Sequence, residues 1–451
     1  MSQFKVDEAI LNGVHHYSGE EDYVAPPWEV AEKLEWFQDQ KLALMVHMGL
    51  YCEIGTTASW GLSDHDAAWS RKDFADHPIS GREYRDMYFN LNKSFNPVRF
   101  DPKEWASLAA DNGFRYLIFT TKHHDGFCLW DTRETQYKTT SFDCPYSSNR
   151  NADIVRSVFD AFREKGLGIA AYFSKPDWHS PYYWAEGMAH SEPTWRMTSY
   201  DPEEYPELWE KFVQYTQKQI LELTTQYGDV DILWLDGGQV RPDTGLDIRL
   251  SEAVEQARRV KPDLIVADRT VGGAFENYVT PEQTVPDAAM KIPWESNVSL
   301  GESYTYRFDD TYKSLNTVIR LLIDVVCKGG NLALNISPQP DGRLPKPGIE
   351  IMKGIGNWMK KYGEAIYQTR ICAPYKKDNV AFTRNSRNVF AFVLSEDGKT
   401  YTDAVIPYCE AVSEVELMNT RQHTAFERVP EGLRVKFDPI RDEIALVFKL
   451  V

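Results

Sequence analysis

The sequence predicts an α/β protein, with a (β/α)8-like barrel followed by a C-terminal antiparallel β-sandwich. Helical patterns alternate with short apolar strands over most of the chain, and about six such pairs favour a parallel sheet closed into a barrel. After Tyr367 the pattern changes to short alternating runs separated by turn residues, which is typical of antiparallel sheets. With 451 residues, 42% of them hydrophobic, the chain can bury one large core and a smaller one.

The predicted barrel elements are helices that are each followed by a strand. Each strand is a short apolar run, as expected for parallel strands that are covered on both faces. Some strands of a regular barrel are weak or missing, so we expect an irregular one. The helix and strand pairs are 28–37 with 41–46, 102–112 with 116–121, 154–165 with 168–173, 206–226 with 231–235, 250–259 with 264–267, and 317–326 with 331–336.

The last part of the chain carries the predicted sandwich. Turn pairs such as Asp-Gly and Glu-Gly separate its strands, and no repeat or low-complexity linker precedes them. We therefore divide the chain into a barrel domain at 1–368 and a β-sandwich domain at 369–451, and we expect the two to pack together. The predicted strands are 389–394, 402–407, 415–418, 433–437 and 443–448.

Composition and charge narrow the classes of function. A net charge of −17 repels phosphate backbones and anionic lipids, so we expect neither a nucleic-acid nor a membrane partner. The 13 Trp and 24 Tyr residues suit a protein that binds sugars, because their flat rings stack on pyranoses. Nothing in the sequence indicates an oligomeric state, and a homo-oligomer is left open.

The sequence also bears on location and on metal or cofactor use. The first ten residues contain no signal peptide and no later run is apolar enough to span a bilayer, which predicts a cytoplasmic protein. If a signal peptide has been removed, the protein would instead be secreted or periplasmic. The six cysteines form no close pair, so we expect reduced thiols, no zinc site and no cofactor.

The most informative segment is 228–239, an apolar strand that ends in Asp236 and two glycines. In α/β folds ligands bind at the carboxyl ends of strands, so an acid at this position is a candidate site residue. Asp236 could also be only a loop residue that caps the next helix, and this segment alone leaves both interpretations open.

Other predicted strands also end in polar side chains. His47 follows the first strand, His123 and His124 follow the second, and Arg269 follows the strand at 264–267. In a barrel these ends converge on one mouth. Several histidines, an arginine and carboxylates in one pocket are typical of an active site.

Residues 116–132 read YLIFTTKHHDGFCLWDT, and the KHHDGF block within them is the most specific feature of the sequence. Together with the strand ending at Asp236, the stretch KGGNLALNISPQPDG at 328–342 and GEAIY at 363–367, this segment resembles the α-L-fucosidases of glycoside hydrolase family 29. The resemblance covers about residues 28 to 370 and implies a distorted barrel followed by a β-sandwich, in agreement with the pattern above.

The resemblance implies a retaining exo-α-L-fucosidase that removes terminal α-L-fucosyl residues from oligosaccharides or glycoconjugates through a covalent glycosyl-enzyme. Asp236 matches the nucleophile of the family. The acid/base lies on a variable segment, where Glu295 is the best match and Glu302 its rival, with Glu276 and Glu282 behind them. Apolar neighbours, including Trp294, could desolvate Glu295 and raise its pKa, as a general acid requires.

The other site residues are implied to bind the sugar. His47, His123 and His124 would hydrogen-bond hydroxyls, because a neutral imidazole both donates and accepts. Tyr172 would lie beside the nucleophile, and Arg269 would orient the reactive centre. The remaining candidates are Trp60 and Trp234. Each could make apolar contact with the sugar ring or its methyl group, or could instead belong to the core.

The chain departs from the family pattern at two places. It has His47-Met48-Gly49 where the family usually has His-Trp-Gly, and it has no Glu-Trp-Tyr motif, carrying a Trp60-Gly61 pair and then Ser63 and Asp64 instead. These polar residues could admit a hydroxyl where fucose has a methyl group, which would make the enzyme an α-L-galactosidase.

Two other classes of protein remain as alternatives. A metal-dependent hydrolase could use His47, His123, His124 and Asp236 as ligands, but adjacent histidines on an extended strand point in opposite directions. A catalytically silent fucose-binding protein is the other alternative, and the pair of candidate carboxylates argues against it.

Overall fold

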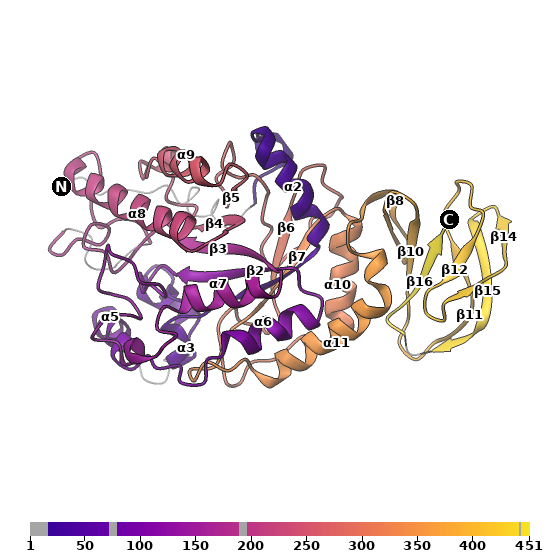
Figure 1. The fold of residues 1–451 in the computed structure, drawn as a ribbon, viewed down its shortest axis with the longest axis horizontal. Helices are drawn as coiled ribbons and strands as arrows, with labels where there is room; N and C mark the ends of the chain where they lie inside the picture. Colours follow the sequence, from indigo (N-terminus) through magenta and orange to yellow (C-terminus); the bar gives the residue numbers. More distant parts are fainter. Residues whose placement is uncertain (1–16, 72–78, 189–195, 442) are drawn as a thin grey trace.

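The computed structural model describes residues 17–71, 79–188, 196–441 and 443–451 (Figure 1). The first ten residues, on which the predicted location rests, lie outside these ranges. A curled parallel sheet with helices packed around it forms the larger part of the molecule. Two antiparallel sheets form the other end, next to α10 and α11 (Figure 1).

The larger sheet has seven parallel strands in the order β5-β4-β3-β2-β1-β7-β6. Its predicted strands are confirmed, and their ends differ from the predicted ones by no more than one residue. Strand β6 was not predicted, because four of its five residues are polar and give no apolar run. The bounds are β1 Leu42–Val46, β2 Tyr116–Lys122, β3 Gly168–Ser174, β4 Ile232–Asp236, β5 Ile265–Asp268, β6 Glu295–Ser299 and β7 Asn331–Ile336.

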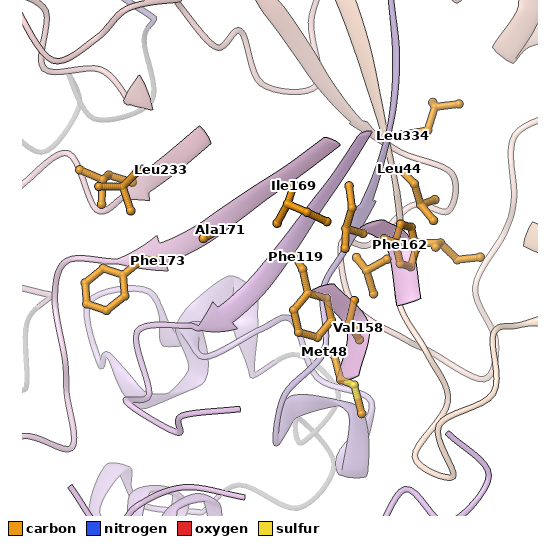
Figure 2. Close-up of a cluster of buried hydrophobic side chains, with 14 of the residues drawn as sticks. Leu44, Met48, Phe119, Val158, Phe162, Ile169, Ala171, Phe173, Leu233 and Leu334 are labelled. Carbon is orange, nitrogen blue, oxygen red and sulfur yellow. The ribbon is translucent and has the colours of Figure 1, made fainter. Parts of the chain in front are cut away.

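Alternate residues of these strands belong to two different cores. Leu44, Phe119 and Leu233 face outward, in the same apolar cluster as Val158 and Phe162 of α7 (Figure 2). The residues between them form a second cluster inside the barrel, which includes Met45, Ile118, Tyr172, Trp234 and Ala267. Because side chains alternate along a strand, His47 and Asp236 continue the inward rows of Met45 and Trp234.

The helices begin where the sequence supplies capping residues. Asp101 accepts hydrogen bonds from the backbone of Lys103 and Glu104 at the start of α6, and Ser314 caps α10 in the same way. No helix of the described residues is long and apolar enough to cross a membrane. The main helices are α2 Trp28–Gln40, α5 Gly81–Phe89, α6 Pro102–Asp111, α7 Ile154–Glu164, α8 Pro206–Gln226, α9 Leu250–Val260, α10 Leu315–Cys327 and α11 Lys346–Tyr362.

An irregular segment, residues 276–283, joins the two edges of the sheet. At one side the backbone N–H of Asn277 donates to the carbonyl of Val266 in β5, at 2.9 Å. At the other side isolated bridges pair Val279 with Trp294 and Glu282 with Asn297 of β6. This segment, hereafter the seam, therefore completes the irregular barrel that the sequence predicts.

The C-terminal part contains two antiparallel sheets packed around a third cluster. Phe390 and Phe392 belong instead to the main core, where the ring of Phe392 stacks on Trp358 of α11. The division at 368/369 stays a prediction, because this core runs across it. The strands are β8 Arg370–Lys377, β9 Val380–Arg384, β10 Val389–Leu394, β11 Thr400–Ile406, β12 Val415–Leu417, β13 Gln422–His423, β14 Phe426–Val429, β15 Gly432–Arg441 and β16 Ala445–Leu450.

Candidate active site

A cavity of about 470 Å³ opens at the carboxyl ends of the parallel strands. It brings together eight of the nine residues that the sequence singled out. The exception is Glu295. The wall includes His47, Trp60, Trp69, His123, His124, Tyr172, Trp234, Asp236, Gln239, Arg269, Glu282, Asn297, Glu302, Tyr304, Arg307, Asp309 and Asp310.

Asp236 is the last residue of β4, and its carboxylate is held by two donors. The hydroxyl of Tyr172 donates to Oδ2 at 2.5 Å, and Nη1 of Arg269 donates to Oδ1 at 2.9 Å. Burial by itself raises the pKa of Asp236, but the charge of Arg269 and the Tyr172 hydrogen bond outweigh it and hold the pKa well below its usual range. The side chain is 18% exposed and stays ionised, as a nucleophile requires.

Arg269 joins Asp236 to a second carboxylate, that of Glu282 on the seam. Its Nη2 donates to Glu282 Oε2 at 2.5 Å, and its Nε donates to Thr280 Oγ1 at 3.2 Å. The guanidinium also lies over the ring of Trp234, 4.7 Å from the centroid. Because one planar group binds both carboxylates, they lie within a short distance of each other across the cavity.

His47 has its orientation fixed by a side chain on the neighbouring strand. Its Nδ1 lies 2.7 Å from Asn335 Oδ1, while the amide nitrogen of Asn335 donates to the carbonyl of Tyr304. The amide oxygen can only accept, so His47 carries its proton on Nδ1. Burial lowers the pKa of His47 to about 4, and it therefore acts as a neutral imidazole.

The two adjacent histidines both face the cavity, which corrects the expectation that they point in opposite directions. Strand β2 ends at Lys122, and His123 and His124 lie in the turn after it, with ring centroids 4.4 Å apart. Burial lowers the pKa of both imidazoles, that of His124 to about 4. One atom each of His123, His124 and Asp236 lie within 4.8 Å of one another, a spacing that could hold a metal ion.

Aromatic rings form the apolar surface of the cavity. The rings of Tyr172 and Trp234 stack with centroids 5.0 Å apart. Trp60 packs edge-on against His124 at 4.9 Å, and Trp69, which is 47% exposed, lies next to it nearer the mouth. The cavity thus has an inner part with imidazoles and carboxylates and an outer part with Trp69.

Glu295 lies outside the cavity, which corrects its assignment as the acid/base. It is the first residue of β6, at the end of the strand away from the mouth, and it is fully buried. Its carboxylate accepts hydrogen bonds from Tyr116, from Trp234 Nε1 at 3.3 Å and from Tyr278 at 3.4 Å. Burial raises its pKa to about 7, so the expected desolvation is present at the wrong end of the barrel.

Glu295 is therefore expected to affect stability. Its pKa of about 7 in the folded protein exceeds the ordinary value of 4.5, so its stabilising contribution is complete below pH 4.5 and is lost as pH rises through 7. The neutral variant Glu295→Gln should avoid this loss, which amounts to roughly 2 to 3 kcal/mol between pH 5 and pH 8. Urea unfolding at the two pH values measures it, and an identical pH dependence in both proteins would contradict it.

The residues that distinguish this chain from the family pattern are placed differently than expected. Ser63 is buried away from the cavity wall, and Asp64 forms ion pairs with Arg71 and Arg85. Neither can select between fucose and L-galactose by direct contact. The α-L-galactosidase interpretation therefore loses the observation that motivated it.

Among the wall residues that were not predicted for the site, three bear most on its chemistry. Tyr304 contacts the ring of His47 with centroids 5.2 Å apart, and Trp69 lines the outer part. Glu282 was weighed only behind Glu295 and Glu302. The sequence held one signal for Glu282, the stretch GAFENYVTPE at 273–282 after Arg269, which lacks the period of a helix or a strand.

Comparisons with known proteins point to one family. The sequence model of the family described as Alpha-L-fucosidase matches residues 14–364. The α-L-fucosidase of Dictyostelium discoideum is 26% identical over 389 residues, 80% of this chain and 78% of that protein. A crystal structure of the Thermotoga maritima α-fucosidase in complex with fucose is 27% identical with a TM-score of 0.73, and the match covers 92% of this chain and 96% of that one. A trapped covalent intermediate of an α-L-fucosidase from Bacteroides thetaiotaomicron, 24% identical with a TM-score of 0.75 over 93% and 96% of the two chains, has the same fold.

Proposed function

Because the chain belongs to the α-L-fucosidase family, glycoside hydrolase family 29, we propose that it hydrolyses terminal α-L-fucosyl residues with retention of configuration. Its substrate would be a fucosylated oligosaccharide or glycoconjugate. The observation that carries the proposal is the pair of carboxylates, Asp236 and Glu282, bound to the same guanidinium of Arg269. Retaining enzymes need two carboxyl groups only about 5 Å apart, and this shared partner supports such a spacing.

In this mechanism Asp236 attacks the anomeric carbon and forms the glycosyl-enzyme. Glu282 replaces Glu295 as the proposed acid/base. It first protonates the leaving oxygen and then, as a carboxylate, removes a proton from the attacking water. Its side chain is 42% exposed at the mouth, where a leaving group departs and water enters.

The sugar itself would lie in the inner part of the cavity. The neutral imidazoles of His47, His123 and His124 are proposed to bind its hydroxyls, and Tyr172 and Arg269 to hold the nucleophile. Trp60 and Trp234 offer apolar surface for the ring and its methyl group. This division leaves the outer part for the group to which fucose is attached.

The substrate is tested with nitrophenyl α-L-fucoside, α-L-galactoside and β-D-galactoside. We expect the fucoside to be turned over with the highest kcat/KM. A preference for the α-L-galactoside would overturn the substrate proposal and leave the retaining mechanism in place. A protein that binds fucose and hydrolyses none of the three would instead be a silent sugar-binding protein.

The spacing of His123, His124 and Asp236 raises a metal-dependent hydrolase as a second candidate. Arg269 places a guanidinium 2.9 Å from the Asp236 carboxylate, and this positive charge disfavours a cation at the same group. We therefore expect fucoside hydrolysis to be the same with and without EDTA. Loss of activity in EDTA that returns with added metal would support the second candidate.

Trp69 is proposed to support the sugar on the leaving-group side. Trp69→Ala should raise KM for a fucosylated oligosaccharide about tenfold, because one aromatic stacking contact is lost. Turnover of α-L-fucosyl fluoride should not change, since this substrate has no second ring. Trp28→Ala, at an exposed tryptophan of α2 away from the cavity, is the matched control. An equal effect on both substrates would argue against the stacking role.

We also propose a cytoplasmic location, since all six cysteines are free thiols, five of them buried. Fractionation of the source cells tests it.

A further inference from the structure

Ser59 connects His123 to a buried carboxylate behind the cavity wall. Its hydroxyl oxygen lies 2.6 Å from His123 Nδ1 and 3.0 Å from Asp125 Oδ2, and it accepts from the backbone N–H of Asp125 at 3.2 Å. Ser59, His123 and Asp125 are each no more than 5% exposed. Neither Ser59 nor Asp125 takes part in the ion pairs of Asp236.

The direction of each hydrogen bond follows from the chemistry of the groups. Asp125 is anchored by Tyr88, whose hydroxyl donates to Oδ2 at 2.7 Å, and by the backbone N–H of Phe127, which donates to Oδ1 at 2.9 Å. Burial raises the pKa of Asp125 to about 6, so at pH 8 it is a carboxylate and can only accept. The single hydroxyl proton of Ser59 is then committed to Asp125.

A hydroxyl has one proton to donate and two lone pairs to accept. One lone pair of Ser59 takes the backbone N–H of Asp125, and the other faces His123 Nδ1. The short contact to His123 is therefore favourable only if the imidazole carries its proton on Nδ1. His123 Nε2 has no hydrogen-bond partner among the described residues, so its lone pair is left for the cavity.

We propose that Ser59 and Asp125 are positioning residues that lock His123 in the Nδ1–H tautomer, so that the cavity presents Nε2 as an acceptor for a sugar hydroxyl. His47 reaches the same state by a different route, through Asn335. Two fixed acceptors in one pocket select a substrate with two hydroxyl donors at matching positions. A ligand group that can only accept, such as an ether oxygen, would place its lone pair against the lone pair of a histidine Nε2, and such a ligand would bind poorly.

The tautomer is tested directly by NMR of the full-length protein with ¹⁵N-labelled histidine at pH 8. In the wild type we expect both His123 and His47 to show a protonated Nδ1 and an unprotonated Nε2. In Ser59→Ala, His123 should change to a mixture or to the Nε2–H form, while His47 should keep its signals and report that the fold is intact. A wild-type His123 protonated on Nε2, or one unaffected by Ser59→Ala, would overturn the proposal. This readout needs no turnover, so it is independent of the proposed fucosidase activity.

Kinetics test the consequence for recognition, which does rest on the proposed function. We expect Ser59→Ala to lower kcat/KM for an aryl fucoside on the order of tenfold to hundredfold, and Ser59→Thr, which keeps the hydroxyl, to restore most of it. Monodeoxy fucosides locate the hydroxyl concerned. The wild type should hydrolyse the analogue that lacks this hydroxyl more slowly than the complete fucoside. For Ser59→Ala, the rates with these two substrates should differ little. If each deoxy analogue lowers kcat/KM by the same factor in the wild type and in Ser59→Ala, Ser59 does not act through His123.

Discussion

Replacing Asp236 with alanine is expected to lower kcat for nitrophenyl fucoside by about four to five orders of magnitude, because no other group can form the glycosyl-enzyme. The fold should persist, since the neighbouring strands β3 and β5 hold β4 through the backbone. Steady-state rates and circular dichroism measure the two effects. Asp309→Ala, which removes an exposed carboxylate of the cavity wall, should keep most of the activity and serves as the matched control.

Adding azide to the Asp236→Ala variant tests whether the lost carboxylate is the nucleophile. In Asp236→Ala the small anion can occupy the space of the lost carboxylate and attack from the same side. The product should then be β-L-fucosyl azide, with inverted configuration. Absence of this product together with a small loss of rate would show that the nucleophile lies elsewhere.

Glu282→Gln is expected to have the second largest effect, with a loss that depends on the leaving group. For a fucosylated oligosaccharide, whose leaving oxygen needs a proton, kcat should fall by about three orders of magnitude. For a dinitrophenyl fucoside, which leaves without help, the glycosyl-enzyme should form nearly normally and accumulate. Azide should then attack from the opposite side and give α-L-fucosyl azide, with retained configuration.

Two variants distinguish Glu282 from the other carboxylates. Glu302→Gln changes an exposed residue of the outer cavity wall, and Glu295→Gln changes the buried residue below Trp234. Both should hydrolyse the oligosaccharide within about tenfold of the wild type. The assignment of Glu282 would be wrong if either of them, rather than Glu282→Gln, responded to azide.

Much of the fold and half of the site could be predicted because they depend on local chain properties. A run such as Ile232–Leu235 is recognisable as a strand covered on both faces, and the residue at its end is thereby placed at the mouth. Asp236, His47 and Arg269 all follow such runs. For these residues the position in the chain determines the position in space.

The other half of the site depends on contacts that no local pattern reports. Strand β6 is polar and is held by pairing with β7 and the seam, so its period gives no signal, and Glu295 was assigned to a variable segment as the acid/base. Glu282 is brought near Asp236 by its isolated bridge to Asn297 of β6 and by Arg269, which binds both carboxylates. Burial raises the pKa of Glu295 to about 7, as expected, but burial alone does not place a carboxyl group at the cavity wall.

The irregular seam also bears on how specificity can diverge within this architecture. The nucleophile and its donor Tyr172 are fixed by ladders of parallel strands, where a change in length would shift the register of a whole sheet. Glu282 is attached through isolated bridges between the sheet edges, where the chain can lengthen or shorten without that penalty. Exchange of this segment between homologous enzymes should therefore transfer linkage preference as a module, while the monosaccharide that is accepted stays the same.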